Sequence, residues 1–263
     1  MSEPRDSRIY FASDLHLGAP DTAASRVREK DFLRWMDHIE ARCEALYLVG
    51  DVFDFWFDYR RVVPKGAVRL LGRLAAWTDR GIPVHYFLGN HDMWMNGYLA
   101  DEVGVMIHDD VLEAEHHGHR LLIGHGDGKG PNDRSYKRLK KLFRHPLARR
   151  AFRWLHPDIG IALADRWSGR SRASSADEVF HGLDDEWLVA YCRRRLESAR
   201  YDYLVFGHRH LPLQIDLDAN SRYVNLGDWI THRTYGELGP DGLVLRRWPD
   251  GDVLPVIDGT DGR

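Results

Sequence analysis

The stretch Ala45-Leu-Tyr-Leu-Val-Gly-Asp51 sets the pattern of the whole chain, because an apolar run ends there on a glycine and an aspartate. Such a run predicts a buried β-strand, and the Gly-Asp pair predicts the turn that closes it. The same arrangement recurs at Val84–Leu88, which is followed by a Gly-Asn pair. The apolar residues of 24–41 and 65–79 recur at helical spacing. Strands that alternate with helices predict an α/β sheet.

The rest of the chain continues this alternation and adds one segment of a different character. The predicted elements are a strand at Arg8–Ala12, two strands or one hairpin over 105–124, a helix over 184–199, a strand at Tyr203–Phe206 and short β-runs over 212–257. Three short helices are predicted between them, at Tyr136–Phe143, Leu147–Leu155 and Ile159–Trp167. We therefore expect a single domain over 1–263 with a helical insertion, the cap segment, at about 128–182.

The composition excludes several classes of protein. Of the 263 residues, 43% are hydrophobic and nine are Trp, which argues against disorder. The apolar runs fall short of the ~18 residues that span a bilayer. Residues 1–11 lack the apolar core of a signal peptide, so we expect a cytoplasmic protein. Cys43 and Cys192 form no paired framework, which fits a reducing compartment.

The net charge of −3 hides an uneven distribution of charge. Residues 128–173 contain 13 Lys and Arg against 3 Asp, which gives a local charge of +10. The remaining chain carries 24 basic and 37 acidic residues, which gives −13. An asymmetry of this size predicts an anionic partner for the basic segment.

Polar side chains follow five of the predicted strands, usually behind a glycine. They occur in Asp14-Leu-His16, Gly50-Asp51, Gly89-Asn90-His91-Asp92, Gly124-His125-Gly126-Asp127 and Gly207-His208-Arg209-His210. Ligands and catalytic groups of open α/β sheets gather at the carboxyl ends of the strands, so these five loops can converge on one site.

The residue types in these loops indicate a site for divalent metal ions. The candidate ligands are Asp14, His16, Asp51, Asn90, His125, His208 and His210. Because they include no Cys, they exclude a structural thiolate zinc site and favour Mn²⁺, Fe²⁺ or Zn²⁺. Seven ligands exceed the needs of one ion and suit two ions ~3.5–4 Å apart that share a carboxylate. Such pairs generate hydroxide at neutral pH and bind phosphate oxygens, so hydrolysis of a phosphate ester or anhydride is expected.

Each motif has an ordinary structural interpretation when it stands alone. An Asp-x-His or Gly-Asp pair usually caps a helix or forms a turn, and residues 89–92 could form a hairpin turn. The ordered set of five favours the metal site. The other histidines are interpreted as structural, namely His116, His117 and His119 in a solvated hairpin turn, and His38, His108, His181 and His232.

The series DLHLG, GDVFDFW, GNHD, GHGD and GHRH resembles the calcineurin-like metallophosphoesterase superfamily. Within it, the chain is most similar to the bacterial UDP-2,3-diacylglucosamine hydrolases of the lipid A pathway. That narrower resemblance rests on Gly50–Trp56, on His125-Gly-Asp127 followed by Asp133-Arg-Ser-Tyr136, and on the basic insertion that ends near 168–175. The resemblance implies a four-layer α/β/β/α sandwich with a helical cap, and a centre of two manganese ions.

The resemblance also implies a role for each matching residue. One ion would be bound by Asp14, His16, Asp51 and His210, and the other by Asp51, Asn90, His125 and His208. His91 would be catalytic and would be supported by Asp92, while the substrate contacts would be Asn90, His91, Tyr136 and Arg209. The chain departs from the pattern at His91, where many UDP-2,3-diacylglucosamine hydrolases carry Arg.

The cap segment predicts the substrate, because it starts directly after His125 and combines basic with apolar side chains. An apolar, basic-rimmed cap beside two metal ions suits a substrate with acyl chains and a diphosphate. We therefore expect hydrolysis of the pyrophosphate bond of UDP-2,3-diacylglucosamine to UMP and 2,3-diacylglucosamine 1-phosphate. A basic amphipathic helix also predicts peripheral association with the anionic cytoplasmic face of the inner membrane. The same pattern also fits an ordinary helical hairpin that packs on the sandwich with a solvated basic face.

Two other functions stay open from the sequence. The first is a phosphoesterase of the same superfamily that acts on a soluble nucleotide or phosphoester. The second is a nucleic-acid-binding protein that uses the basic segment on phosphates. No nucleic acid is expected as partner, because three apolar-faced helices suit acyl chains better than bases.

Overall fold

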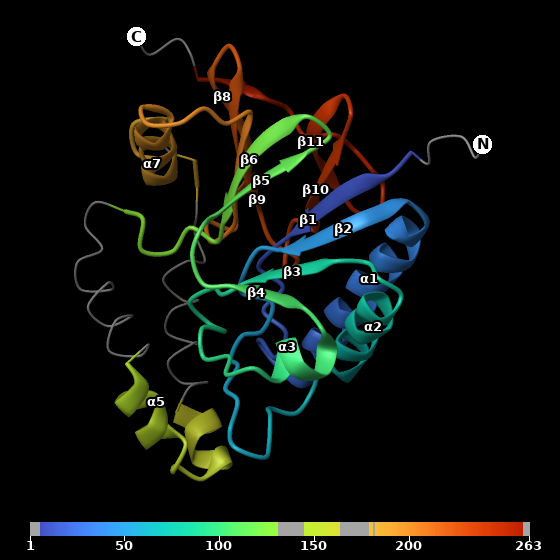
Figure 1. Ribbon diagram of the computed structural model, residues 1–263, viewed down its shortest axis with the longest axis vertical. Coiled ribbons are helices and arrows are strands. Elements are labelled where there is room, and N and C mark those ends of the chain that lie inside the picture. Colours follow the sequence, from blue (N-terminus) through green and yellow to red (C-terminus); the bar gives the residue numbers. More distant parts are fainter. Residues whose placement is uncertain (1–5, 131–144, 164–178, 181, 260–263) are drawn as a thin grey trace.

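The computed structural model describes residues 6–130, 145–163, 179–180 and 182–259 (Figure 1). Several predictions on the cap segment lie outside the described residues: the helix at Tyr136–Phe143, the substrate contact Tyr136, the basic loop at 168–175, and the last part of the helix at Ile159–Trp167. None of the helices in the described ranges combines the length and the apolar character needed to span a lipid bilayer.

The first sheet has six strands in the order β11-β10-β1-β2-β3-β4. Its strands are β1 (Arg8–Ala12), β2 (Cys43–Leu48), β3 (Val84–Phe87), β4 (Met106–His108), β10 (Thr234–Gly239) and β11 (Gly242–Arg247). Strands β1 to β4 are parallel neighbours, whereas β10 pairs antiparallel with β1 and with β11. The carboxyl ends of β1, β2 and β3 therefore lie at one edge of this sheet.

The second sheet also has six strands, in the order β12-β8-β9-β7-β6-β5. Its strands are β5 (Leu112–His116), β6 (His119–Gly124), β7 (Tyr203–Phe206), β8 (Pro212–Asp218), β9 (Ser221–Leu226) and β12 (Ile257–Asp258). Strands β6, β7 and β9 are parallel, and β5 and β8 are antiparallel to their neighbours β6 and β9. Both sheets are therefore mixed.

Helices cover the outer face of each sheet, which gives four layers (Figure 1). The first sheet is covered by α1 (Thr22–Ile39), α2 (Val68–Asp79) and α3 (Tyr98–Val103), and the second by α7 (Trp187–Leu196). A short 3₁₀ turn, η1 (Glu40–Arg42), follows α1, and α5 (Pro146–Phe152) belongs to the cap segment.

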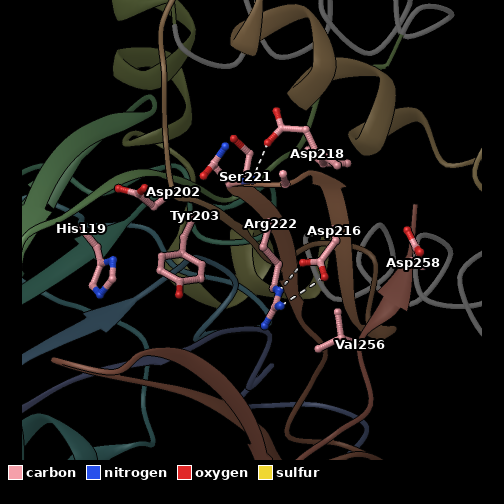
Figure 2. A pocket seen from close by; sticks show the side chains of 12 residues that line it. His119, Asp202, Tyr203, Asp216, Asp218, Ser221, Arg222, Val256 and Asp258 are labelled. Atoms are coloured by element: carbon pink, nitrogen blue, oxygen red, sulfur yellow. Dashed lines mark hydrogen bonds and ion pairs between the residues drawn. The ribbon is translucent and has the colours of Figure 1, made fainter. Parts of the chain in front are cut away.

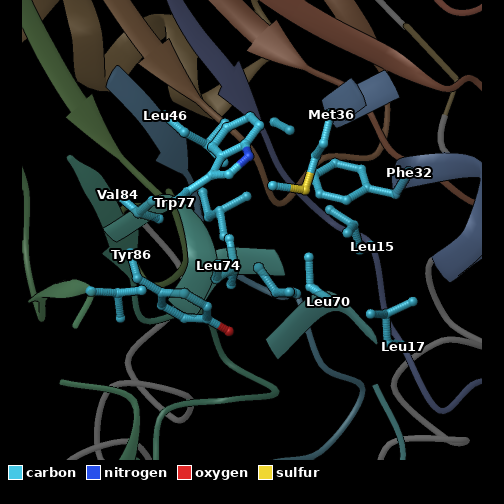
Figure 3. Packing of buried hydrophobic residues seen from close by; sticks show 14 of the residues in the cluster. Leu15, Leu17, Phe32, Met36, Leu46, Leu70, Leu74, Trp77, Val84 and Tyr86 are labelled. Carbon is cyan, nitrogen blue, oxygen red and sulfur yellow. The ribbon is translucent and has the colours of Figure 1, made fainter. Parts of the chain in front are cut away.

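Three apolar clusters fill the spaces between the four layers and hold the layers together. The first lies between α1, α2 and the first sheet and includes Phe32, Leu74, Trp77 and Tyr86 (Figure 3). The second fills the space between the sheets and includes Phe11, Tyr47, Val205 and Leu245. The third joins the second sheet to α7 and includes Leu188, Cys192, Phe206 and Tyr223. The predicted four-layer α/β/β/α sandwich is thus confirmed.

The ends of the helices follow from local chemistry. The Asp21 carboxylate accepts hydrogen bonds from the N–H groups of Ala23 and Ala24, so α1 begins two residues earlier than predicted. Helix α2 begins at Val68, later than predicted, because Gly66 and Ala67 have φ angles of 107° and 49°. Such angles lie outside the right-handed helical region.

The prediction that the histidines around the β5–β6 turn are solvated is wrong for His116 and His117. The side chain of His117 is only 16% exposed, and its Nε2 atom lies 3.6 Å from a carboxylate oxygen of Glu44. His117 and Gly118 form the turn, with φ angles of 51° and 81°. The Nε2 atom of His116 lies 2.7 Å from the hydroxyl oxygen of Tyr47 in the space between the sheets. Because this contact joins residues of different sheets, no local pattern in the sequence indicated it.

Truncation of the core of the first layer should destabilise the protein strongly. Phe32 is fully buried, with its ring centroid 4.9 Å from Trp35 and 4.7 Å from Trp229. We expect Phe32→Ala to lower the free energy of unfolding by about 3–5 kcal/mol, measured by urea denaturation. Val27→Ala in the same helix is the control, because Val27 is 67% exposed. Equal effects of the two substitutions would contradict the assigned core.

Candidate metal centre

The predicted site residues lie in loops at the carboxyl ends of five strands, three from the first sheet and two from the second. Asp14 and His16 follow β1, Asp51 follows β2, Asn90 and His91 follow β3, His125 follows β6, and His208 and His210 follow β7. The two sheets pack face to face, so the five loops meet at one end of the sandwich. The expected convergence of these residues is observed.

The backbone of this site is held in an uncommon conformation. Five of the residues have φ in the left-handed region: Asp14 (55°), His16 (44°), Asp51 (51°), His208 (70°) and His210 (49°). Only a few per cent of non-glycine residues adopt such angles, and those that do cluster at functional sites. Hydrogen bonds between neighbouring loops hold them, since Asp14 N–H donates to Gly50 O over 3.0 Å and His16 N–H donates to Asp51 O over 2.9 Å.

The first group of donors consists of Asp14, His16 and His210, whose ligand atoms lie within 4.8 Å of one another. The Nε2 atom of His210 is 3.2 Å from Asp14 Oδ1 and 3.1 Å from His16 Nε2. The Oδ1 atom of Asp14 is buried and has no donor in hydrogen-bonding geometry among the described residues. A buried carboxylate oxygen that faces two imidazoles suits a divalent cation between them.

The second group consists of Asp51, His125 and His208. The Nε2 atom of His125 lies 3.3 Å from Asp51 Oδ2 and 3.2 Å from Asn90 Oδ1. On the other side of the ring, Nδ1 lies 2.8 Å from the carbonyl oxygen of Val49. Because a carbonyl only accepts, Nδ1 keeps a proton, and Nε2 can present a lone pair to a metal ion that displaces its proton.

Asp51 connects the two groups. A third set of three possible ligands contains His16, Asp51 and His91, so Asp51 belongs to two of the three sets. Its Oδ2 atom is 3.8 Å from His16 Nε2 and 3.3 Å from His125 Nε2. This position suits the predicted bridging carboxylate. The clustered His and Asp groups are consistent with a binuclear metal site, and the assignment of each ligand to one ion stays a prediction.

The electrostatics of the site favour bound positive charge. Burial alone would raise the pKa of Asp14, but His210 and His16 hold it well below its ordinary value, and His125 and His91 lower the pKa of Asp51. Burial alone would lower the pKa of His125, but Asp51 and Asp14 raise it to about 10. The carboxylates therefore stay ionised at neutral pH, and a cation that binds displaces imidazole protons.

Asp92 joins the loops after β2 and β3. Its fully buried carboxylate accepts hydrogen bonds from Val52 N–H over 2.9 Å, from Gly89 N–H over 2.8 Å and from the Tyr86 hydroxyl over 2.5 Å. Burial and the charge of Asp51 raise the pKa of Asp92 to about 6. This bonding suits a residue that positions the loops, so its predicted support of His91 would act through the backbone.

Asp54 is a residue of the site that the sequence analysis did not select. Its Oδ1 atom lies 3.4 Å from His16 Nδ1 and 3.7 Å from His91 Nδ1, and its carbonyl oxygen lies 3.0 Å from the latter atom. Asp54 therefore orients the rings of one predicted ligand and of the predicted catalytic histidine. The available signal was an isolated acidic residue in the apolar run Val52–Phe57.

Two arginines near the site are used to hold loops. The guanidinium of Arg28, on α1, donates to the carbonyl oxygens of Leu15, His16 and Ala19 over 2.5–2.6 Å. The guanidinium of Arg209 forms two 3.1 Å contacts with the carboxylate of Glu186, which is only 2% exposed. The side chain of Arg209 is thus anchored to the start of α7, and its contact with substrate stays a prediction.

An open pocket of about 820 Å³ lies away from this site. It is formed at the amino ends of β6, β7 and β9, opposite the metal centre. Figure 2 shows the side chains that line it. Its lining is rich in carboxylates, and Arg222 within it is paired with Asp216 at 2.6 Å. None of the predicted site residues lines it.

Comparison with known proteins places these motifs in a family. The chain matches the family model of the calcineurin-like phosphoesterases over residues 7–212. It is 36% identical over 260 residues to a protein of Porphyromonas gingivalis named UDP-2,3-diacylglucosamine hydrolase, which covers 93% of this chain and 98% of that protein. Proteins of the same name from Bordetella parapertussis and Proteus mirabilis are 31% and 28% identical, over 84% and 91% of this chain and 85% and 98% of their own lengths.

Removal of the Asp51 charge should disrupt the binding of metal. We expect Asp51→Asn to lower the affinity for Mn²⁺ by at least about 100-fold, because this carboxylate faces both donor groups. Titration followed by electron paramagnetic resonance of free Mn²⁺ measures the affinity and the number of ions bound. Asp250→Asn, which removes an exposed carboxylate, is the control. An unchanged titration of Asp51→Asn would rule out the bridging assignment.

Proposed function

The chain belongs to the calcineurin-like phosphoesterase family, and we propose that it is a dimetal hydrolase of UDP-2,3-diacylglucosamine in lipid A biosynthesis. The products would be UMP and 2,3-diacylglucosamine 1-phosphate. The observation that carries this proposal is the likeness to the Porphyromonas gingivalis hydrolase, which extends over 93% of this chain and therefore includes the cap segment. A likeness confined to the metal-site motifs would support only a phosphoesterase of some kind.

The residues of the site fit the metal ions that this reaction needs. Asp14, His16, Asp51 and His210 would hold one ion, and Asp51, Asn90, His125 and His208 the other. Divalent ions bound there, for which the resemblance implies Mn²⁺, supply positive charge for phosphate oxygens and lower the pKa of water. The oxygen and imidazole donors fit Mn²⁺, Fe²⁺ or Zn²⁺.

His91 is the proposed catalytic residue. Its Nδ1 atom lies 3.0 Å from the Asp54 carbonyl oxygen, which leaves Nε2 for the substrate. Burial lowers the pKa of His91, so the ring is neutral before substrate binds. An anionic diphosphate nearby raises that pKa again. Nε2 can then carry a proton and stabilise the negative charge that develops on the phosphate oxygens.

The described part of the cap segment supports a substrate with acyl chains. Leu147, Trp154, Ile159 and Leu163 are 68%, 89%, 60% and 53% exposed, although all four are apolar. Leu147 lies on α5, Trp154 in the turn after it, and Ile159 and Leu163 in the helical stretch 157–163. Large exposed apolar patches mark binding surfaces for lipid or protein. Arg153 is exposed among them, and the mixture of apolar and basic groups suits the cytoplasmic face of an anionic inner membrane.

One residue favours a second candidate function. His91 stands where many UDP-2,3-diacylglucosamine hydrolases carry Arg, and an imidazole presents one donor to a phosphate where a guanidinium presents a fork of donors. This difference would favour a smaller phosphoester or a soluble nucleotide as substrate. The likeness over the cap segment weighs against this candidate.

Release of UMP is the direct test of the proposed function. We expect the Mn²⁺-loaded protein to release UMP from UDP-2,3-diacylglucosamine in detergent micelles, to lose this activity with a chelator and to regain it with Mn²⁺. His91→Ala should lower kcat by about 100- to 1,000-fold. His38→Ala, which removes an exposed histidine of α1, should leave kcat unchanged. Rapid hydrolysis of soluble nucleotides without UMP release from the lipid would establish the second candidate instead.

The membrane partner is tested separately. Trp154→Ser should weaken binding to phosphatidylglycerol vesicles by about tenfold. The variant lacks the indole ring, whose transfer from water into the lipid would stabilise the bound state. Sedimentation with the vesicles measures the bound fraction. Val27→Ser is the control, since Val27 is 67% exposed but lies on α1. Equal binding of the Trp154→Ser variant and the unmodified protein would contradict a membrane-facing cap.

A further inference from the structure

Helix α5 of the cap segment is bonded directly to the loop that carries two predicted site residues. A guanidinium nitrogen of Arg149 donates to the carbonyl oxygen of Met95 over 2.7 Å and also to Asn96 Oδ1. Met95 and Asn96 follow Asn90 and His91 in the same loop after β3. One side chain of the cap thus reaches the backbone a few residues from the proposed catalytic histidine.

The loop that receives Arg149 is itself fixed. The Asp58 carboxylate, which is only 4% exposed, accepts hydrogen bonds from Asn96 N–H over 2.5 Å and from Tyr98 N–H over 3.2 Å. A β-bridge between Phe57 and Trp94 joins the loop after β2 to the loop after β3. The loops that contain Asp51 and Asn90 are therefore one unit, to which α5 is attached.

A second contact between α5 and this unit is apolar. The ring of Phe152 lies 4.7 Å from Phe57 and 4.8 Å from Trp94, measured between centroids. The chain after α5 also approaches closely, since a Cβ on Gly160 would lie 2.1 Å from the Tyr59 hydroxyl. Apolar contact is non-directional, so it holds α5 near the loops without fixing its position along them. Charge-assisted hydrogen bonds have the directionality that fixes position.

We propose that Arg149 is a positioning residue that determines specificity for the acylated substrate. It fixes α5 relative to the loop of Asn90 and His91, so that acyl chains held by the cap lie at a set distance from the phosphate that is cleaved. This inference rests on the proposed function. It predicts that Arg149 affects long-chain substrates, which contact both parts of the protein, and has little effect on small phosphodiesters, which contact only the metal centre.

The neighbouring residue provides a matched control. Arg150 lies on the same helix and carries the same charge, but its side chain is exposed. Arg149→Met therefore removes a guanidinium that is bonded to the loop after β3, and Arg150→Met removes one that is exposed. Arg149→Lys keeps the positive charge and can still donate a hydrogen bond to the loop. Its KM for the acylated substrate should therefore lie between those of the unmodified protein and Arg149→Met.

Kinetics with two substrates test the proposal. We expect Arg149→Met to raise KM for UDP-2,3-diacylglucosamine by about tenfold, with kcat/KM for bis(p-nitrophenyl) phosphate within about twofold of the unmodified protein. Arg150→Met should change neither value. A parallel loss on both substrates would mean a merely structural role and would overturn the proposal, as would equal kinetics of Arg149→Met and Arg150→Met.

A second measurement separates this inference from the proposed function. Hydrogen exchange of residues 147–160 should be faster in Arg149→Met than in Arg150→Met, with unchanged Mn²⁺ content. If the unmodified protein releases no UMP from the lipid, the proposed function fails, and the substrate specificity assigned to Arg149 fails with it. Faster exchange would then still establish the attachment of α5, whereas unchanged exchange would overturn that as well.

Discussion

Two buried carboxylates, Asp14 and Asp51, are the constraint on which the rest of the site depends. They are 0% and 1% exposed, and neighbouring imidazoles keep both of them ionised. A buried charge is costly unless opposite charge and hydrogen-bond donors surround it. His208 N–H donates to Asp14 and His91 N–H donates to Asp51, both over 2.9 Å. These hydrogen bonds bring loops from both sheets together, and a divalent cation bound there can balance the remaining negative charge of the two carboxylates.

This constraint explains the glycine that follows two of the strands. A Cβ on Gly89 would lie 2.1 Å from Oδ1 of Asp51, and a Cβ on Gly207 would lie 2.6 Å from Oδ2 of Asp14. Side chains at these positions would occupy the space of the carboxylates themselves. At these two strand ends the glycine is therefore a consequence of close packing around a buried carboxylate, whereas a Cβ on Gly50 would meet the His125 ring and one on Gly124 would meet Val111.

Basic residues near the site have two different physical roles. The local charge of +10 over 128–173 suggests a surface for an anionic partner. Arg149, however, donates to a carbonyl and an amide of the loop after β3, and Arg28 and Arg209 hold other loops of the site. Some of the arginines counted in the sequence thus position the backbone of loops. In the cap segment, Arg149 attaches the helix to the site, whereas the exposed apolar side chains form a different part of its surface.

The sequence by itself determined the α/β fold, most of the strand and helix order and the polar residues that converge at one end of the sandwich, because each of these is written in a local pattern of apolar spacing, glycine and donor residues. It missed α3, and it predicted two strands or one hairpin over 105–124, where the structure has β4 in the first sheet and β5 and β6 in the second. Only the tertiary structure decided that Asp54 orients His16 and His91, that His116 meets Tyr47, that Arg209 pairs with Glu186 and that Arg149 reaches Met95. These contacts join residues that are far apart in the chain, and one of them involves Arg149 but not the adjacent Arg150. Their partners depend on how loops and layers pack, and a charge or ring in the sequence does not specify which partner it meets.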